Sequence, residues 1–260
     1  MNDFSLLSNK IEDCKYEKIA FIIDTSDEIY KEDFKTNNNE KFTRIDMIFD
    51  EIIAFCKLKD FISSKATEFR LYTYSDYLKI EIDFLPMKEF ISKIHQVKNN
   101  LKTHIFFGKS IIDLANIFAE TLKVLQSLDS KKENFIPSVS EIIVRVIFFY
   151  NRSDISATNS DDEKFNKATF IKLTNFYFDI IFLRKRILNE EDKIIQNEVF
   201  NSLTSVQSKN WYAFEVSGYY AKFKNSMSLL LANPNQRVKF SDIDKQQKCL
   251  EEIVKSYLEY

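Results

Sequence analysis

The residues best suited to chemistry lie directly after the first apolar run of the chain. Residues 18–24 are almost continuously apolar, as in a strand buried on both faces of a parallel sheet, and a polar run follows from Asp24 to Glu28. Ligands of open α/β sheets bind at the carboxyl ends of the strands. The carboxylate of Asp24 and the hydroxyl of Ser26 are oxygen ligands of the kind that Mg²⁺ prefers. The spacing therefore predicts a candidate cation site, with a helix N-cap and turn as the structural alternative.

The composition excludes several classes of enzyme site. Gly108 and Gly218 are the only glycines among 260 residues, which rules out the three-glycine dinucleotide fingerprint, the Walker phosphate loop and the G-x-S-x-G nucleophile elbow. The two histidines and three cysteines form neither an H-E-x-x-H motif nor a C-x-x-C pair, so we expect no zinc site. With a net charge of −2, the chain has no excess of positive charge to neutralise phosphates. We therefore expect neither nucleic acid nor membrane as a partner.

The cysteines and the start of the sequence predict the cellular compartment. Cys14, Cys56 and Cys249 are far apart and odd in number, and the first residues show no apolar stretch of the signal-peptide type. We therefore expect a reduced intracellular compartment.

The apolar pattern predicts the elements that would position the candidate loop. Six short segments read as strands: 18–24, 68–74, 78–84, 141–150, 177–183 and 211–216. Six segments carry apolar residues at helical spacing: 42–58, 86–101, 110–126, 162–175, 192–205 and 219–232. Because only three residues separate the second strand from the third, these two must pair as an antiparallel hairpin. The remaining alternation predicts an α/β fold with a mostly parallel sheet.

The polar loop and the element order together resemble the von Willebrand factor A family. That family binds a cation with a D-x-S-x-S loop, which Asp24 and Ser26 match in part, and Thr103 is similar to a threonine that the family uses as a further ligand. Glu28 replaces the second serine, and Asn151 stands where the family has an aspartate. The resemblance implies a doubly wound, mostly parallel sheet with one antiparallel hairpin edge and helices on both faces. It also implies a degenerate metal site at Asp24, Ser26 and Thr103, which we expect to hold no cation.

Segments in the second half of the chain narrow the resemblance to one subfamily. Residues 145–152, 177–183, 212–216 and 228–237, with Glu68-Phe69, are similar to the von Willebrand factor A-like scaffold subunit of the BRISC and BRCA1-A deubiquitinase complexes. This resemblance implies a non-catalytic adaptor that stabilises such a complex by binding its BRE-type ubiquitin-fold scaffold subunit, while a separate zinc metalloprotease performs the chemistry. It further implies a cytoplasmic and nuclear protein of ubiquitin signalling and the DNA damage response, without a cofactor of its own.

The end of the chain is the candidate partner-binding segment. Residues 233–237 break the preceding helix, and an apolar stripe follows at Ile243, Leu250, Ile253, Val254, Tyr257 and Leu258. Each large side chain of the stripe gains roughly 1.5–3 kcal/mol on burial, so the stripe must dock on its own domain or on a partner. We expect partner contacts at Pro234, Gln236, Arg237, Ile253 and Tyr257. The resulting organisation is an N-terminal extension at 1–16, a von Willebrand factor A-like domain at 17–237 and a C-terminal amphipathic helix at 238–260.

Two other functions remain open at this level. One is a free-standing A domain that binds its ligand through a cation, for which titration with Mg²⁺ is the discriminating observation. The other is a metal-assisted hydrolase with its site at Asp24, Ser26 and Thr103. The absence of an aspartate at position 151, and of a nearby general base, counts against the hydrolase.

Overall fold

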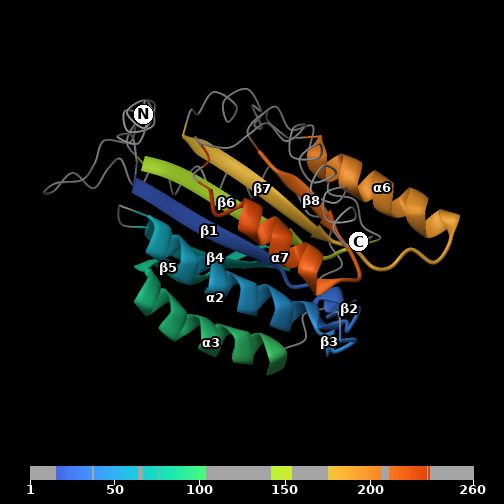
Figure 1. The fold of residues 1–260 in the computed structure, drawn as a ribbon, viewed down its shortest axis with the longest axis horizontal. Coiled ribbons are helices and arrows are strands. Elements are labelled where there is room, and N and C mark those ends of the chain that lie inside the picture. Colours follow the sequence, from blue (N-terminus) through green and yellow to red (C-terminus); the bar gives the residue numbers. More distant parts are fainter. Residues whose placement is uncertain are drawn as a thin grey trace, which may run out of the picture.

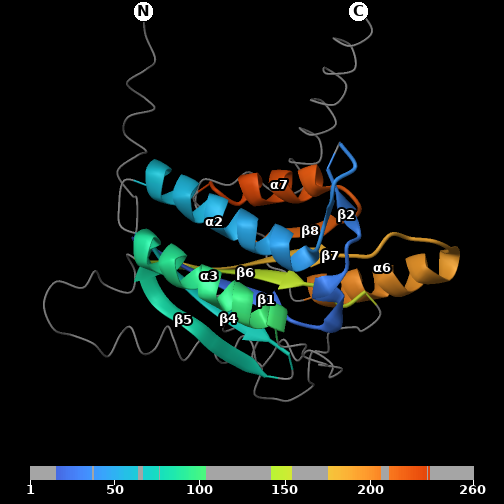
Figure 2. The same ribbon diagram turned by 90° about the horizontal axis from the view of Figure 1, so that it is seen from below.

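A mostly parallel sheet with helices on both faces forms the part of the chain that the computed structural model describes (Figures 1 and 2). The described residues are 16–36, 38–63, 67–75, 77–103, 142–153, 175–205, 211–232 and 234. Within them, the main sheet has six strands in the order β5-β4-β1-β6-β7-β8. Their bounds are β1 Tyr16–Asp24, β4 Thr67–Tyr74, β5 Leu78–Pro86, β6 Ile142–Tyr150, β7 Phe176–Leu183 and β8 Ala213–Val216.

The middle of the sheet is buried on both faces. All nine residues of β6 and all eight of β7 are buried, which explains why their sequences are apolar at almost every position rather than at every second one. Strand β1 pairs in parallel with β4 on one side and with β6 on the other, so that Phe21 lies between Leu71 and Ile147. The first strand of the chain is therefore central in the sheet.

The predicted hairpin forms one edge of the sheet. Strand β5 pairs antiparallel with β4, with Tyr72 opposite Ile80 and Tyr74 opposite Leu78. A β-bulge lies between the Leu71/Ile82 and Tyr72/Ile80 pairs, so Ile82 is buried while Ile80, two residues away, is about half exposed. The antiparallel pair that the short connection predicts is confirmed.

Two hydrophobic cores lie on opposite faces of the sheet. Helices α2 (Arg44–Ile62), α3 (Met87–Thr103) and α7 (Tyr220–Leu229) cover one face, and α6 (Glu190–Thr204) packs on the other (Figure 2). Phe21 is at the centre of the first core, where its ring contacts Phe55, Phe69 and Phe90 at centroid distances of 5.7, 6.3 and 6.1 Å. Its neighbour Ile22 belongs to the second core. The predicted α/β class with helices on both faces is confirmed.

The segment between β1 and α2 has more structure than the sequence pattern predicts. It holds a short 3-10 helix, η1 (Asp27–Tyr30), and a small antiparallel hairpin of β2 (Phe34–Lys35) and β3 (Lys41–Phe42). Helix α2 then begins at an N-cap, because the Thr43 side chain accepts a hydrogen bond from the Asp46 backbone at 3.2 Å. The sequence pattern did not predict this hairpin, because the segment is polar and two-residue strands are too short to show an alternation of apolar and polar residues.

Several predicted boundaries shift, and some predicted elements lie outside the described residues. The last strand begins at Ala213 rather than 211, and the following helix ends at Leu229 rather than 232. The predicted helices at 110–126 and 162–175, the predicted C-terminal helix and residues 1–15 of the predicted extension at 1–16 lie outside the described residues, whereas Tyr16 begins β1. None of the helices in the described part is both long and apolar enough to span a membrane.

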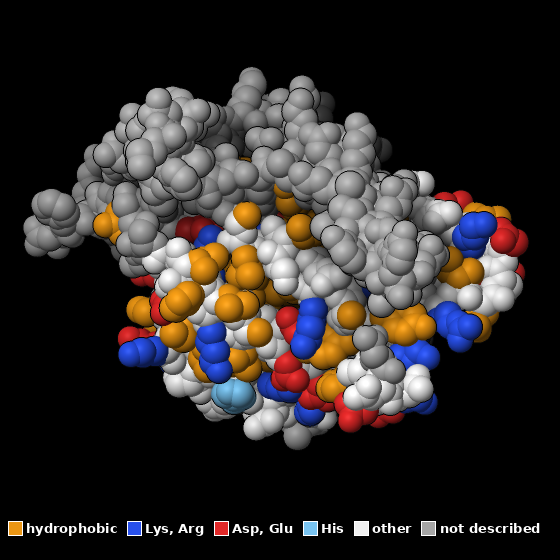
Figure 3. Space-filling model, viewed as in Figure 1, with side chains coloured by type: hydrophobic (Ala, Val, Ile, Leu, Met, Phe, Trp, Pro, Cys, Tyr) orange, Lys and Arg blue, Asp and Glu red, His pale blue; other side chains and the backbone are white. Residues whose placement is uncertain are grey.

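The described surface mixes charged and apolar side chains (Figure 3). Three hydrophobic residues lie at helical spacing near the end of α2 and are among the most exposed: Leu58 at 49%, Phe61 at 87% and Ile62 at 55%. Figure 3 shows hydrophobic side chains over this part of α2, with lysine and acidic residues around them.

Candidate functional site

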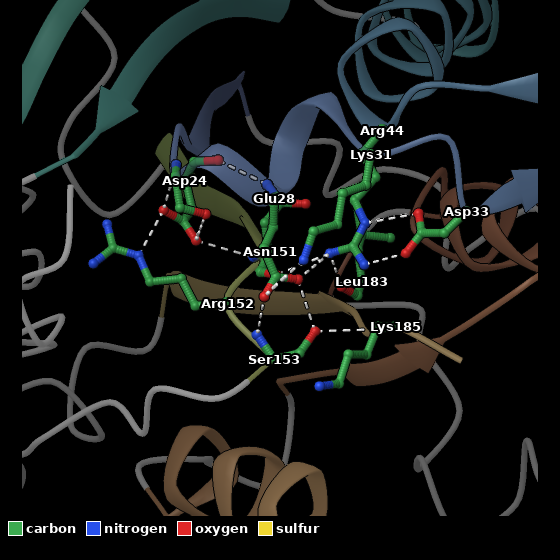
Figure 4. A network of polar contacts seen from close by, with 11 residues as sticks. Asp24, Glu28, Lys31, Asp33, Arg44, Asn151, Arg152, Ser153, Leu183 and Lys185 are labelled. Atoms are coloured by element: carbon green, nitrogen blue, oxygen red, sulfur yellow. Dashed lines mark hydrogen bonds and ion pairs between the residues drawn. The ribbon is translucent and has the colours of Figure 1, made fainter. Parts of the chain in front are cut away.

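The polar loops that follow β1 and β6 meet at the carboxyl edge of the sheet (Figure 4). These strands are parallel neighbours with Ile23 opposite Phe149, so Asp24 and Asn151 leave the sheet side by side. The Asn151 side chain donates a hydrogen bond to the Asp24 carbonyl at 2.7 Å, which holds the two strand ends together. The topology therefore brings together residues that are 127 positions apart in the sequence.

The Asp24 carboxylate is fully buried and accepts hydrogen bonds on both oxygens. Oδ1 accepts from Arg152 Nε at 3.0 Å and from the Ser26 backbone at 3.2 Å. Oδ2 accepts from the Asn151 backbone at 3.0 Å and from the Ser26 hydroxyl at 3.4 Å. The Arg152 guanidinium also donates to the Ser75 carbonyl at 2.6 Å, so its position is fixed from two sides. The carboxylate is thus saturated by donors of the chain itself.

Burial and the nearby positive charge have opposite effects on the pKa of Asp24. Removal from water raises the pKa of this carboxyl, while the Arg152 charge and the hydrogen bonds from Asn151, Arg152 and Ser26 oppose the increase. A buried carboxylate in such a setting needs a positive partner, and the Arg152 guanidinium is that partner.

Glu28 is the second buried carboxylate of this edge, and it too is paired. It lies on η1, accepts from the Ser153 hydroxyl at 3.0 Å and forms an ion pair with Arg44 at 3.3 Å. Lys31 lies 3.5 Å from its other oxygen. The Ser153 hydroxyl in turn accepts from the Lys185 backbone at 3.1 Å. Glu28 therefore connects η1 to the loops after β6 and β7.

Arg44, the first residue of α2, is fully buried and links the ends of β6 and β7 to the segment before β2. Its Nη1 donates to the Asn151 carbonyl at 2.8 Å and to the Leu183 carbonyl at 2.6 Å. Its Nε donates to Asp33 at 3.0 Å, and the two side chains form an ion pair. The edge where a cation site was predicted is therefore a closed network of paired side chains and backbone carbonyls (Figure 4).

The structure brings together part of the predicted metal site. Asp24 and Ser26 are in contact, and Asp24 forms the predicted turn by accepting from the backbone two residues ahead. Ser26 is the N-cap residue of η1, at the position that the helix-cap alternative predicts, but its side chain makes no capping hydrogen bond. Thr103 is the last residue of α3, whose end approaches η1, because the Tyr30 hydroxyl donates to the Leu101 carbonyl at 2.7 Å.

The arrangement of Asp24 and Ser26 does not fit a divalent cation. Mg²⁺ requires several free oxygen ligands in near-octahedral geometry, whereas the Asp24 oxygens already accept from four donors, one of them a guanidinium. In the described part of the chain, no group of three or more His, Cys, Asp or Glu side chains is placed to hold a metal ion. The sequence reasoning missed Arg44 and Arg152 at this site. The available signal was a charged residue, Arg152, two positions beyond a strand that is apolar to its end.

A second buried ion network holds the segment that leads to the predicted partner-binding tail. Arg145 and Asp179 form an ion pair at 2.8 Å, and Lys59 pairs with Glu17 at 2.6 Å. Arg145 also donates to the Leu230 carbonyl, and Lys59 donates to the Leu231 carbonyl at 3.2 Å. Both carbonyls follow α7, so this network anchors the end of that helix to the sheet and to α2.

Of the predicted partner-binding residues, the described part contains Pro234 alone, and this residue is buried. Gln236, Arg237, Ile253 and Tyr257 lie outside the described residues.

The sequence comparisons agree with the narrower resemblance. No protein-family model matches the chain. The BRISC and BRCA1-A complex member 1 of Xenopus tropicalis is 24% identical over 228 residues, covering 85% of this chain and 66% of that protein. The protein of the same name from Xenopus laevis is 24% identical over 229 residues, covering 85% and 64%. This chain thus spans about two thirds of the length of the curated relatives that it matches, and the predicted resemblance is confirmed.

Solved structures share the fold at low sequence identity. The N-terminal domain of TFIIH p34 aligns with a TM-score of 0.51 at 10% identity, over 84% of this chain and 98% of that chain. A mutant of the PilB minor pilin from Streptococcus sanguinis aligns with a TM-score of 0.51 at 10% identity, over 85% and 62%. Together with the strand order and the antiparallel edge, these likenesses confirm the α/β fold with a mostly parallel sheet that the sequence predicts.

Proposed function

We propose that this chain is a non-catalytic subunit of a deubiquitinase complex of the BRISC type, and that it stabilises the complex by binding a BRE-type ubiquitin-fold scaffold subunit. The observation that carries the proposal is the match over 85% of the chain to two relatives that are named as members of the BRISC and BRCA1-A complexes. The von Willebrand factor A-like fold is consistent with it. In the cell, such a subunit would reside in the cytoplasm and nucleus.

The chemistry of the carboxyl edge supports a subunit without a reaction of its own. A general base needs a carboxylate that is free to take a proton from a substrate. Here both buried carboxylates of the edge are engaged, Asp24 with Arg152 and Glu28 with Arg44 and Ser153. Opening Asp24 to a substrate would leave the buried Arg152 without its carboxylate partner, at considerable cost in stability. Opening Glu28 would break its contacts with Arg44 and Ser153.

The anchoring of the segment after α7 supports a role for the tail in binding. Leu230 and Leu231 are held by two buried cations, Arg145 and Lys59, so the chain leaves the domain from a fixed point. In the proposal, the residues that follow carry the contacts with the scaffold subunit, with Gln236 and Arg237 first and Ile253 and Tyr257 on the apolar stripe. Pro234, which the sequence also suggested, is buried and is left out of the proposed contact surface. An anchored start reduces the conformational entropy that a tail loses when it binds.

Exposed apolar side chains near the end of α2 are a second feature that suits a subunit. Leu58, Phe61 and Ile62 lie on one side of the helix and remain largely accessible. Contiguous exposed apolar groups are uncommon on monomers and often mark interaction sites.

Affinity purification of the tagged full chain from its own cells, followed by quantitative mass spectrometry, tests the proposal. We expect stoichiometric recovery of a scaffold subunit with a ubiquitin fold and of a zinc metalloprotease. Arg237→Ala and a truncation after Arg237 should reduce this recovery at least several-fold. Arg186→Ala is the matched control, because it removes the same side chain from an exposed position of the described domain and should leave recovery unchanged.

Two results would contradict the proposal. One is full recovery of the partners by both tail variants, which would remove the tail from the interface. The other is cleavage of ubiquitin chains by the purified chain alone, which would make it an enzyme. We expect the chain alone to leave ubiquitin chains intact and the purified assembly to cleave them.

A further inference from the structure

The ion pair between Arg152 and Asp24 occupies the place where an A-type cation site would lie. Asp24 is 0% exposed and Arg152 is 1% exposed, so neither charge is solvated by water. The guanidinium approaches the carboxylate from the side away from Glu28 (Figure 4), with Nε 3.0 Å from Oδ1. It also lies 5.9 Å from the Tyr74 ring centroid, and it donates to the Ser75 carbonyl at 2.6 Å. Both strands next to β1 therefore help to hold this positive charge against Asp24.

A guanidinium and a divalent cation are alternatives at this position. Mg²⁺ binds a carboxylate oxygen at about 2.0–2.1 Å and would meet the Arg152 charge at close range without intervening water. Like charges in a buried site repel strongly, because little solvent is present to screen them. The residue at 151 is also an asparagine, so no second carboxylate is available beside Asp24 to offset two cations.

We propose that Arg152 is a built-in cation that replaces the metal of an A-type site, balancing Asp24 and closing this edge to metal-bridged ligands. Arg152 keeps the two strand ends assembled in the way that a bound ion would, at every concentration of Mg²⁺. A partner that binds at this edge is then recognised without a metal bridge.

Thermal unfolding of the full chain, measured in millimolar Mg²⁺ and in EDTA, tests the proposal. The wild-type midpoint is expected to be equal in the two buffers, and calorimetric titration with Mg²⁺ should be flat. Arg152→Gln keeps an amide donor for Asp24 but removes the charge, so its midpoint should fall by roughly 6–20 °C in EDTA. Mg²⁺ should then recover part of the loss, because the Asp24 charge is left without a partner.

Three further variants distinguish the effect of losing the Arg152 charge from a non-specific loss of stability. Arg152→Lys retains the charge and should stay insensitive to Mg²⁺, with a smaller loss of stability than Arg152→Gln. The double variant Asp24→Asn/Arg152→Gln removes both charges, and it should be more stable than Arg152→Gln and insensitive to Mg²⁺. Arg70→Gln is the matched control and should be insensitive to Mg²⁺, because its partner Asp83 is 71% exposed and water can solvate that freed carboxylate.

Three outcomes would overturn the proposal. The first is a saturable Mg²⁺ isotherm for the wild type that Asp24→Asn abolishes. The second is an Arg152→Gln midpoint that Mg²⁺ does not raise, and the third is a double variant that is no more stable than Arg152→Gln. If Arg152→Gln does not fold in EDTA, refolding it in Mg²⁺ gives the decision: recovery supports the proposal and failure contradicts it.

Discussion

Replacing Asp179 by asparagine would take from the buried Arg145 guanidinium its nearest carboxylate partner. Both side chains are fully buried, and Nε of Arg145 lies 2.8 Å from the Asp179 carboxylate. The asparagine oxygen can still accept from the Tyr212 backbone, which donates to Asp179 Oδ1 at 3.0 Å, so the change removes the charge and the acceptor for Arg145 Nε but keeps this bond. Removing one partner of a buried ion pair costs about 3–5 kcal/mol. Glu17 is 3.7 Å from Arg145 and compensates part of the charge, so we expect about 3 kcal/mol.

Urea denaturation followed by circular dichroism measures this loss. The midpoint should fall while the slope m stays the same, because the surface exposed on unfolding does not change. A loss of about 3 kcal/mol is a large part of the roughly 5–15 kcal/mol that stabilises a typical domain. In the double variant Arg145→Met/Asp179→Asn the charge is gone, so this variant should be more stable than Asp179→Asn alone.

Two results would refute the reasoning. A loss below about 1 kcal/mol for Asp179→Asn would mean that the pair is solvated and behaves like a surface ion pair. A double variant that is less stable than the single one would mean that Arg145 contributes through packing and not through its charge. In both cases the anchoring of Leu230 by this network would have to be reconsidered.

Two further predictions concern the core and the helix that follows the carboxyl edge. Ile147 is 0% exposed in the middle of β6, so Ile147→Ala should cost roughly 2–5 kcal/mol in urea denaturation, through lost transfer energy and a cavity; an unchanged midpoint would contradict this. Burial raises the pKa of Asp46, but hydrogen bonds from Lys102 and Thr43 and the nearby Lys98 outweigh it and lower the pKa to about 2. A lowered pKa stabilises the fold above the ordinary value of 3.8 and loses that effect as the pH falls through about 2. Asp46→Asn should therefore cost about 1 kcal/mol at neutral pH, since the site is partly solvated, and the difference from wild type should vanish near pH 2; a difference independent of pH would refute it.

Local patterns in the sequence were sufficient to predict most of the described fold. Continuous apolar runs identified β1, β6 and β7, because a strand that is buried on both faces cannot carry polar side chains at regular intervals. Three residues between β4 and β5 cannot form a crossover, and this alone determined the antiparallel edge. The position of Asp24 at the end of the first strand likewise placed it at the edge where the topology collects polar groups.

The sequence could not determine which charges pair across that edge. Arg152 and Asp24 are 128 positions apart, and Arg44 and Leu183 are 139 apart, so no local period or motif records their contacts. Asp24 read alone is a candidate metal ligand, because oxygen ligands suit Mg²⁺. Only the tertiary structure shows that β6, by lying beside β1, delivers a guanidinium to the same carboxylate. A buried charge is stabilised by the opposite charge that lies next to it in the folded protein. Which residue that is depends on how segments distant in the sequence pack together.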